Sequence, residues 1–184
     1  ESSRFRPVPD GRFDLVIVTG GDGTVLGAAR GIGATPVLAV NSSPSASVGH
    51  YCCATAKTFP AVLAQVLAGD LAPAGLTRIR VSVDGLPVAA PALNDCLFAQ
   101  EVPAATTRYV LECAAGVEEQ KSSGVWIATA AGSSGALRSA GGCTMDALDP
   151  RLQWLVREPF YHFGTGESCR LVNGFAGPEG VTLD

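Results

Sequence analysis

The sequence has no long apolar run, few aromatic residues and little charge. None of its hydrophobic stretches reaches the roughly 18 residues that a membrane-spanning helix needs. Only 16% of the 184 residues are charged, and the formal net charge is −4. Such a chain has no basic surface for nucleic acid or for an anionic membrane, so we expect neither as a partner. Any ligand that carries phosphate must be held by local geometry.

The six cysteines lack the spacing of a metal or disulfide site. They lie at positions 52, 53, 96, 113, 143 and 169, and no two of them form a C-x-x-C pair. This arrangement disfavours both a zinc site and a disulfide framework. Free cysteines are typical of a reducing compartment, so we expect a cytoplasmic protein in which the thiols are small buried residues.

Residues 13–41 have the pattern of a β-α-β unit. The apolar run at 13–19 predicts a strand of a parallel sheet that is covered on both faces, and glycines follow it. A helix is expected over 24–29, and a second buried strand over 36–41. Residues 42–55 are polar and irregular, and another helix is expected over 57–68.

The pattern changes after residue 70 to short β-rich segments. Residues 77–83 alternate polar and apolar side chains, and Asp84-Gly85 predicts a hairpin turn before residues 86–88. Further strands are expected at 93–99, 107–113 and 125–129.

These patterns predict a two-domain α+β chain. Residues 1–72 would form an α/β part with a parallel sheet, and residues 73–184 a mostly β, sandwich-like domain. Both ends have the pattern of an interrupted sheet, so we expect a chain truncated at both ends.

The loop Gly20-Gly21-Asp22-Gly23-Thr24 joins the first strand to the first helix. Glycines let the backbone approach a ligand closely, and the N-terminus of a helix offers N–H groups to phosphate. A carboxylate repels phosphate, so Asp22 suits a general base or a ligand of phosphate-bound Mg²⁺. The structural alternative is that Asp22 caps the helix and the glycines form a tight turn. The loop has neither the Walker A ending nor the G-x-G-x-x-G spacing.

Four segments in this order resemble the NAD kinase family. The loop at 20–24 is similar to the GGDGT signature, which diacylglycerol-type lipid kinases and, as GGDGS, phosphofructokinases share. Asn94-Asp95 resembles the family's Asn-Glu/Asp pair, residues 122–136 resemble its DGxIxSTPTGSTAY stretch, and residues 139–142 match its SAGG. Segments around residues 40–50, 121–124 and 156–159 resemble the mitochondrial-type branch and its bacterial relatives.

The resemblance implies transfer of the γ-phosphoryl group of ATP to the adenosine 2′-hydroxyl of NAD, which gives NADP. Asp22 would be the general base on that hydroxyl. Gly20, Gly21, Gly23 and Thr24 would hold nucleotide phosphates, and Mg²⁺ would arrive with ATP rather than in a metal site of the protein.

The resemblance also implies the residues that bind NAD and the form of the assembly. The residues that match NAD-binding positions are Asn94, Asp95, Ser123, Thr129, Ser133 and Ser134. Two positions depart from the family pattern, because Ser123 replaces an aspartate and Ala136 an aromatic residue. A homo-oligomer, either a dimer or a tetramer, is expected.

Two alternatives remain open. A lipid or sugar kinase could use the same loop, although it would have no use for Asn94-Asp95 and the hydroxyl cluster. A catalytically inactive, nucleotide-binding regulatory relative would account for the departures at Ser123 and Ala136.

Overall fold

The computed structural model describes residues 11–88, 90–102, 104–160 and 169–184. The chain forms two compact units. The first unit extends to Gly75 and also includes Ser82–Ala92, while the second contains Leu76–Val81 and Leu93–Asp184. The division between residues 72 and 73 stays a prediction.

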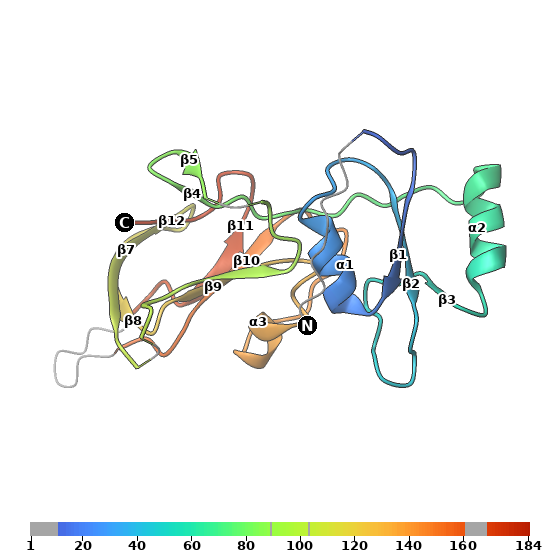
Figure 1. Cartoon of the computed structure of the whole chain (residues 1–184). Coiled ribbons are helices and arrows are strands. Elements are labelled where there is room, and N and C mark those ends of the chain that lie inside the picture. Colours follow the sequence, from blue (N-terminus) through green and yellow to red (C-terminus); the bar gives the residue numbers. More distant parts are fainter. Residues whose placement is uncertain (1–10, 89, 103, 161–168) are drawn as a thin grey trace. The chain divides into compact units, whose positions relative to one another are not determined.

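The first unit contains a parallel sheet with a helix on each face (Figure 1). Its strands β1 (Val16–Gly20), β2 (Val37–Asn41) and β3 (Ala54–Thr55) pair in the order β1-β2-β3. Helix α1 (Asp22–Ala29) connects β1 to β2, and α2 (Phe59–Ala68) follows β3. The predicted β-α-β unit and second helix are confirmed, whereas the short β3 lies in a segment that the sequence describes as irregular.

The central strand of this sheet is better covered than the edge strand. Val18 of β1 forms a buried cluster with Val25 of α1 and Ala39 of β2. On the opposite face Leu38 is 3% exposed, but Ile17 of the edge strand β1 is 44% exposed. The prediction that the first strand is covered on both faces is therefore wrong.

The second unit is built from two antiparallel sheets, one ordered β11-β10-β9-β6 and the other β12-β7-β8. The first contains β6 (Asp95–Phe98), β9 (Val125–Thr129), β10 (Leu152–Val156) and β11 (Asn173–Ala176); the second contains β7 (Thr107–Cys113), β8 (Gly116–Ser122) and β12 (Thr182–Leu183). The mostly β character of this part is confirmed.

Aromatic and branched side chains fill the core of the second unit. Leu111 of β7, Val125 of β9 and Trp154 of β10 are all buried. The ring of Phe98 on β6 meets the ring of Tyr109 on β7 edge to face, with centroids 5.5 Å apart. This contact joins the two sheets, in line with the sandwich-like arrangement that the sequence predicts.

A hairpin of β4 (Ser82–Val83) and β5 (Leu86–Pro87) confirms the predicted turn. Asp84 has φ 50° and Gly85 has φ 77°, which are the positive values of a type I′ turn. Among the described residues, no helix is both long and apolar enough to cross a membrane.

All six cysteines are free, and the expectation that their thiols are buried is wrong. Cys53 and Cys143 are exposed, and the other four are only partly buried.

Candidate active site

The glycine loop lies at the carboxyl end of β1, the edge of an open α/β sheet at which ligands bind. β1 ends at Gly20, Gly21 is the N-cap of α1, and Asp22 is the first helical residue. The alternative in which Asp22 caps the helix is therefore wrong. No side-chain hydrogen bond caps this helix within the described residues.

Packing explains two of the three glycines. A Cβ on Gly20, where φ is 156°, would collide with Thr24 Oγ1, and a Cβ on Gly21 would lie 2.5 Å from Ser47 Oγ. By contrast, nothing lies within 4 Å of the Cβ position of Gly23. Glycine inside a helix costs about 1 kcal/mol relative to alanine, so the fold alone gives no reason for Gly23. The open space beside it suits a ligand that approaches the backbone closely.

The carboxylate of Asp22 is held from the segment that precedes β3. The backbone N–H of Tyr51 donates a hydrogen bond of 2.9 Å to Asp22 Oδ1. The neighbouring Cys52 thiol lies 3.8 Å from the carbonyl oxygen of Gly20. Burial raises the pKa of Cys52, and the charges of Asp22 and Cys53 raise it further. The raised pKa keeps the Cys52 thiol protonated, and a protonated thiol is a poor nucleophile.

A second group of predicted residues gathers at the carboxyl end of β9. The carbonyl oxygen of Asn94 accepts a 2.9 Å hydrogen bond from the N–H of Thr129. Asn94 Nδ2 and Asp95 Oδ2 lie 3.4 Å and 3.8 Å from the Cβ position of Gly135. Partial burial raises the pKa of the Asp95 carboxyl. An amide and a carboxylate thus converge where they can bind hydroxyl and N–H groups.

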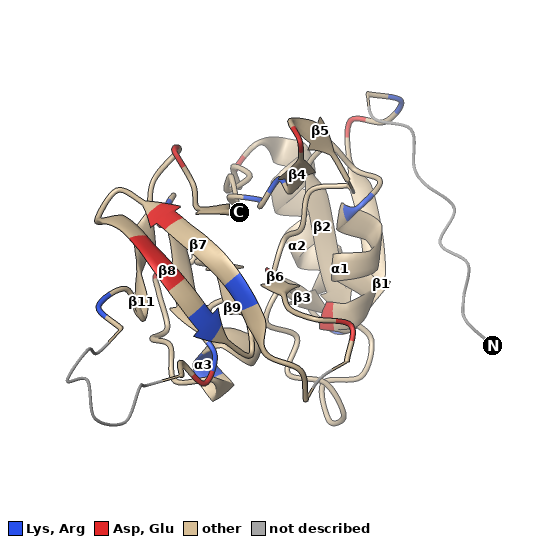
Figure 2. Cartoon of the chain, turned by 90° about the vertical axis from the view of Figure 1, so that its left-hand side faces the viewer, with Lys and Arg blue, Asp and Glu red and all other residues tan. Residues whose placement is uncertain are grey.

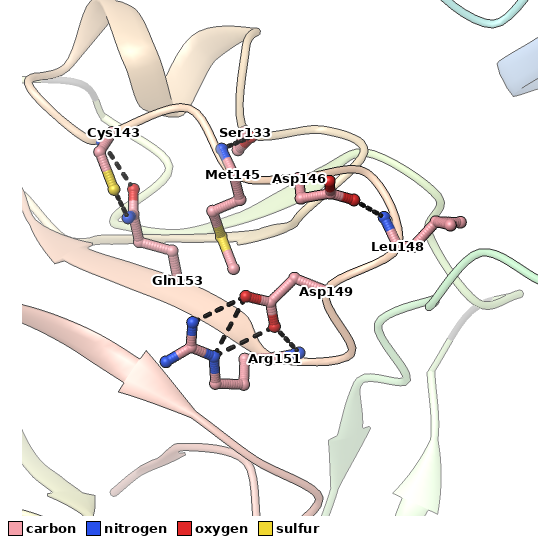
Figure 3. A network of polar contacts seen from close by, with 8 residues as sticks. All are labelled: Ser133, Cys143, Met145, Asp146, Leu148, Asp149, Arg151 and Gln153. Atoms are coloured by element: carbon pink, nitrogen blue, oxygen red, sulfur yellow. Dashed lines mark hydrogen bonds and ion pairs between the residues drawn. The ribbon is translucent and has the colours of Figure 1, made fainter.

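The hydroxyls of Thr129 and Ser133 hold this loop together. Thr129 Oγ1 donates to the carbonyl of Leu93 at 2.6 Å and accepts the N–H of Gly132 at 2.9 Å. Ser133 Oγ donates to the carbonyl of Ala130 at 2.6 Å and accepts the N–H of Met145 at 2.8 Å (Figure 3). Both side chains have 0% exposure.

The sequence did not predict this structural role for the two hydroxyls. Two partners of Thr129, the carbonyls of Asn94 and Leu93, are 35 and 36 residues away along the chain, so no local pattern indicates them. Ser134, the next residue, is exposed. The predicted contacts of Thr129, Ser133 and Ser134 with NAD stay predictions.

Ser123 does not belong to this group. It follows β8 and lies at the opposite end of β9, because the register pairs Phe98 with Val125 and Asp95 with Ala128. Thr129 is six residues beyond Ser123, which corresponds to about 20 Å of extended chain. The N–H of Ser123 donates instead to the carbonyl of Arg157 at 3.0 Å.

Two cations of the second unit lie on its other sheet, which contains β7 and β8. The register of their sheet places Arg108 of β7 directly opposite Lys121 of β8, and Figure 2 shows a basic position in blue on each of these strands. With Glu119 and Phe160 they help to line a cavity of about 650 Å³. Lys121 Nζ lies 4.1 Å from the centre of the Phe160 ring.

The possible metal ligands of the site fit a metal ion that binds together with a nucleotide. Within the described part of the chain, no group of three or more His, Cys, Asp or Glu residues could hold a metal ion. Asp22 offers a single carboxylate at the N-terminus of α1. Mg²⁺ is commonly bound by one or two carboxylates together with the phosphates of its substrate, so the residues present fit this mode.

The fold and the glycine loop define an α+β protein with a glycine-rich turn between a parallel strand and a helix. The family described as ATP-NAD kinase N-terminal domain matches residues 1–71. The chain is 38% identical over 175 residues to a "Probable NADH kinase" of Oryza sativa subsp. japonica, a match that covers 83% of this chain and 53% of the relative. It is 41% identical over 183 residues to the NADH kinase of Arabidopsis thaliana, with 83% and 55% covered. The chain belongs to the NAD kinase family.

The chain spans about half the length of the curated relatives it matches. Its fold is similar to that of the NAD kinase of Archaeoglobus fulgidus in complex with ATP, with a TM-score of 0.70 and 24% identity over 94% of this chain and 66% of that one. It is also similar to yeast NADH kinase complexed with NADH, with a TM-score of 0.69 and 21% identity over 94% and 53%. Both likenesses bear out the predicted fold class.

Proposed function

We propose that this chain provides an ATP-dependent NAD kinase activity, which transfers the γ-phosphoryl group of ATP to the adenosine 2′-hydroxyl of NAD. The observation that carries the proposal is the position of Asp22. Asp22 is the first residue of the helix that follows the carboxyl end of a parallel strand. The Tyr51 N–H donates a hydrogen bond of 2.9 Å to one oxygen of its carboxylate.

In this reaction Asp22 accepts the proton of the 2′-hydroxyl as that oxygen bonds to the γ-phosphorus. The bond between the γ-phosphorus and the β,γ-bridging oxygen breaks, and ADP leaves with the electron pair. Gly20, Gly21, Gly23 and Thr24 hold the nucleotide phosphates through backbone N–H groups and the Thr24 hydroxyl. Mg²⁺, when bound with ATP, supplies neutralisation of phosphate charge.

For the acceptor, we assign the adenosine part of NAD to Asn94, Asp95 and Ser134. The buried hydroxyls of Thr129 and Ser133 keep the loop in place for those contacts. Ser123 would meet another part of NAD, or NAD bound to a second copy in the expected dimer or tetramer. NAD and NADH share the adenosine end, so the same residues serve either form.

The proposed setting is the cytoplasm, and free thiols on all six cysteines support a reducing compartment. The relatives are NAD kinases and NADH kinases by name, which supports the acceptor class.

The test is an assay for NADP with purified protein, ATP, Mg²⁺ and NAD. We expect Asp22→Asn to lower kcat by about 10²–10⁴-fold, because the general base is lost. Asp70→Asn is the matched control, since Asp70 is exposed just beyond the end of α2, and it should leave kcat unchanged.

Other outcomes would favour the alternatives. Phosphorylation of a lipid or sugar without any NADP would support the kinase alternative. Tight NAD binding without turnover would support the inactive regulatory relative.

A further inference from the structure

Asn41 is a buried polar residue to which the proposed reaction gives no role. It ends β2, pairs directly with Gly20 of the glycine loop and is only 4% exposed. A buried amide must satisfy both its donor and its acceptor, so its partners indicate what it holds in place.

Both ends of the Asn41 amide bind the segment between β2 and β3. Oδ1 accepts the N–H of Ser43 at 3.0 Å, and Nδ2 donates to the carbonyl of Ser47 at 3.0 Å. Gly49, with φ 67°, packs so closely against this amide that a Cβ would collide with Nδ2. The buried side chain of Asn41 therefore holds residues 43–49 in place.

The same segment contacts the glycine loop at three points. The N–H of Ser42 donates to the carbonyl of Gly20 at 3.2 Å. Ser47 Oγ lies 2.5 Å from the Cβ position of Gly21, and the N–H of Tyr51 binds Asp22 Oδ1 at 2.9 Å. The place of the carboxylate is thus set by the segment that Asn41 holds.

We propose that Asn41 is a positioning residue for phosphoryl transfer: through residues 43–49 it places the Tyr51 N–H, and so it orients the Asp22 carboxylate. This inference rests on the proposed kinase function. Asn41 touches neither substrate nor the transferred group, and its effect passes through one loop and one backbone hydrogen bond.

The informative variant is Asn41→Asp, which keeps the acceptor for Ser43 but replaces the donor to Ser47 with an oxygen. Misplacement of a catalytic group by about 1 Å costs on the order of 100-fold in rate, so we expect kcat to fall roughly 10- to 100-fold. The KM values for ATP and NAD should change much less, because the substrate contacts remain. An unchanged kcat, or a raised KM alone, would overturn the proposal.

Thr55→Val is the matched control. Thr55 of β3 is the register partner of Asn41 at the same end of the sheet, but its hydroxyl contacts Thr58 before α2. We expect this variant to leave kcat unchanged. If kcat falls equally in both variants, Asn41 has only a structural role.

A double-mutant cycle tests whether the effect passes through the segment. Gly49→Ala forces a methyl group against the Asn41 amide; Asn41→Ala removes the amide atoms of that collision but leaves the Cβ of residue 41 at 3.2 Å, and φ 67° still strains alanine at position 49. We expect the losses in kcat to be non-additive, so that the double variant loses less activity than the product of the two single losses. Fully multiplicative losses would refute the coupling.

The backbone amide of Tyr51 provides a readout that needs no activity. In an amide NMR spectrum, Asp22→Asn should shift the Tyr51 resonance, and Asn41→Asp should shift it too and speed its hydrogen exchange by tenfold or more. An unaltered Tyr51 amide in Asn41→Asp overturns the positioning role. If the wild-type protein makes no NADP while these shifts occur, the proposed function fails and the positioning of Asp22 stands.

Discussion

Gly132 and Asn94 lie in such close contact that no side chain fits between them, because a Cβ on Gly132 would collide with the Asn94 carbonyl. Residues 38 positions apart in the chain thus meet backbone to backbone. The contact places the loop after β9 against the start of β6, where the side chains of Asn94 and Asp95 converge. Several expected outcomes depend on contacts of this kind.

Gly132→Ala should destabilise the second unit and weaken NAD binding. The methyl group would push the loop away from Asn94, and overpacking of this kind costs about 1–3 kcal/mol. We expect a lower Tm and a raised KM for NAD, measured by thermal denaturation and initial rates. Gly75→Ala is the control, because nothing lies within 4 Å of its Cβ position. Equal effects of the two variants would contradict the prediction.

Gly23→Ala should separate stability from activity. Its Cβ position is open, and alanine favours a helix by about 1 kcal/mol over glycine, so Tm should stay the same or rise. The added methyl group should hinder the nucleotide phosphates and raise the KM for ATP. Gly20→Ala should instead lower Tm, because its Cβ would collide with Thr24. A fully active, stabilised Gly23→Ala protein would remove the proposed ligand contact.

Ser133→Ala and Ser134→Ala should have opposite signatures. Ser133 is buried and bonds to Ala130 and Met145, so its loss should cost about 1–3 kcal/mol of unfolding free energy. Ser134 is exposed, and its loss should leave Tm unchanged while raising the KM for NAD. Chemical denaturation and initial rates distinguish the two. If Ser134→Ala lowered the stability and Ser133→Ala did not, Ser134 rather than Ser133 would have the structural role.

Asp95→Asn should stabilise the fold at neutral pH while weakening NAD binding. Burial raises the pKa of Asp95 in the folded state, so the protonated form favours folding, and this stability is lost as the pH rises through the folded pKa. Asparagine removes that dependence. The gain in Tm should be present at pH 7 and vanish below the unfolded pKa, about 3.9. Asp70→Asn, at an exposed site, should show no such gain at either pH.

The exposed pair of Asp149 and Arg151 should contribute little. The guanidinium lies 2.7 Å from the carboxylate and lowers the pKa of Asp149 to about 2 (Figure 3). Any stability from the pair is present above the unfolded pKa and is lost as the pH falls toward 2. Solvent screens such pairs, so Asp149→Asn should leave Tm at pH 7 nearly unchanged. A fall as large as that in Ser133→Ala would contradict this.

A clear hydrophobic pattern allowed several strands to be predicted from the sequence, although β10, which also has one, was missed. β7 and β9 have the predicted bounds, since branched and aromatic residues recur along both. β8 was missed because Glu118, Glu119, Gln120 and Lys121 follow one another in it. Tertiary contacts explain those polar residues: Glu118 accepts the backbone N–H of Leu171 at 2.7 Å.

The candidate site likewise contains residues that could be predicted from the sequence and residues that could not. The glycine loop could be found because its residues are adjacent in the sequence and lie between a strand and a helix. The role of Thr129 could not be found, since it depends on carbonyl partners 35 and 36 residues away. The partners of Asn41 are near it in the sequence, but the contact of their segment with Asp22 comes only from the fold. A buried strand that ends in Asn, with a glycine eight residues later, is the signal that could have indicated the second role.

The contrast among the glycines bears on how this sequence can drift. A descendant without the proposed phosphoryl transfer would still need glycine at positions 20 and 21, where side chains collide. Position 23 would be released from selection, and alanine would be favoured there for the helix alone. The residue at that one position in a homologue therefore records whether the ancestral chemistry is still in use.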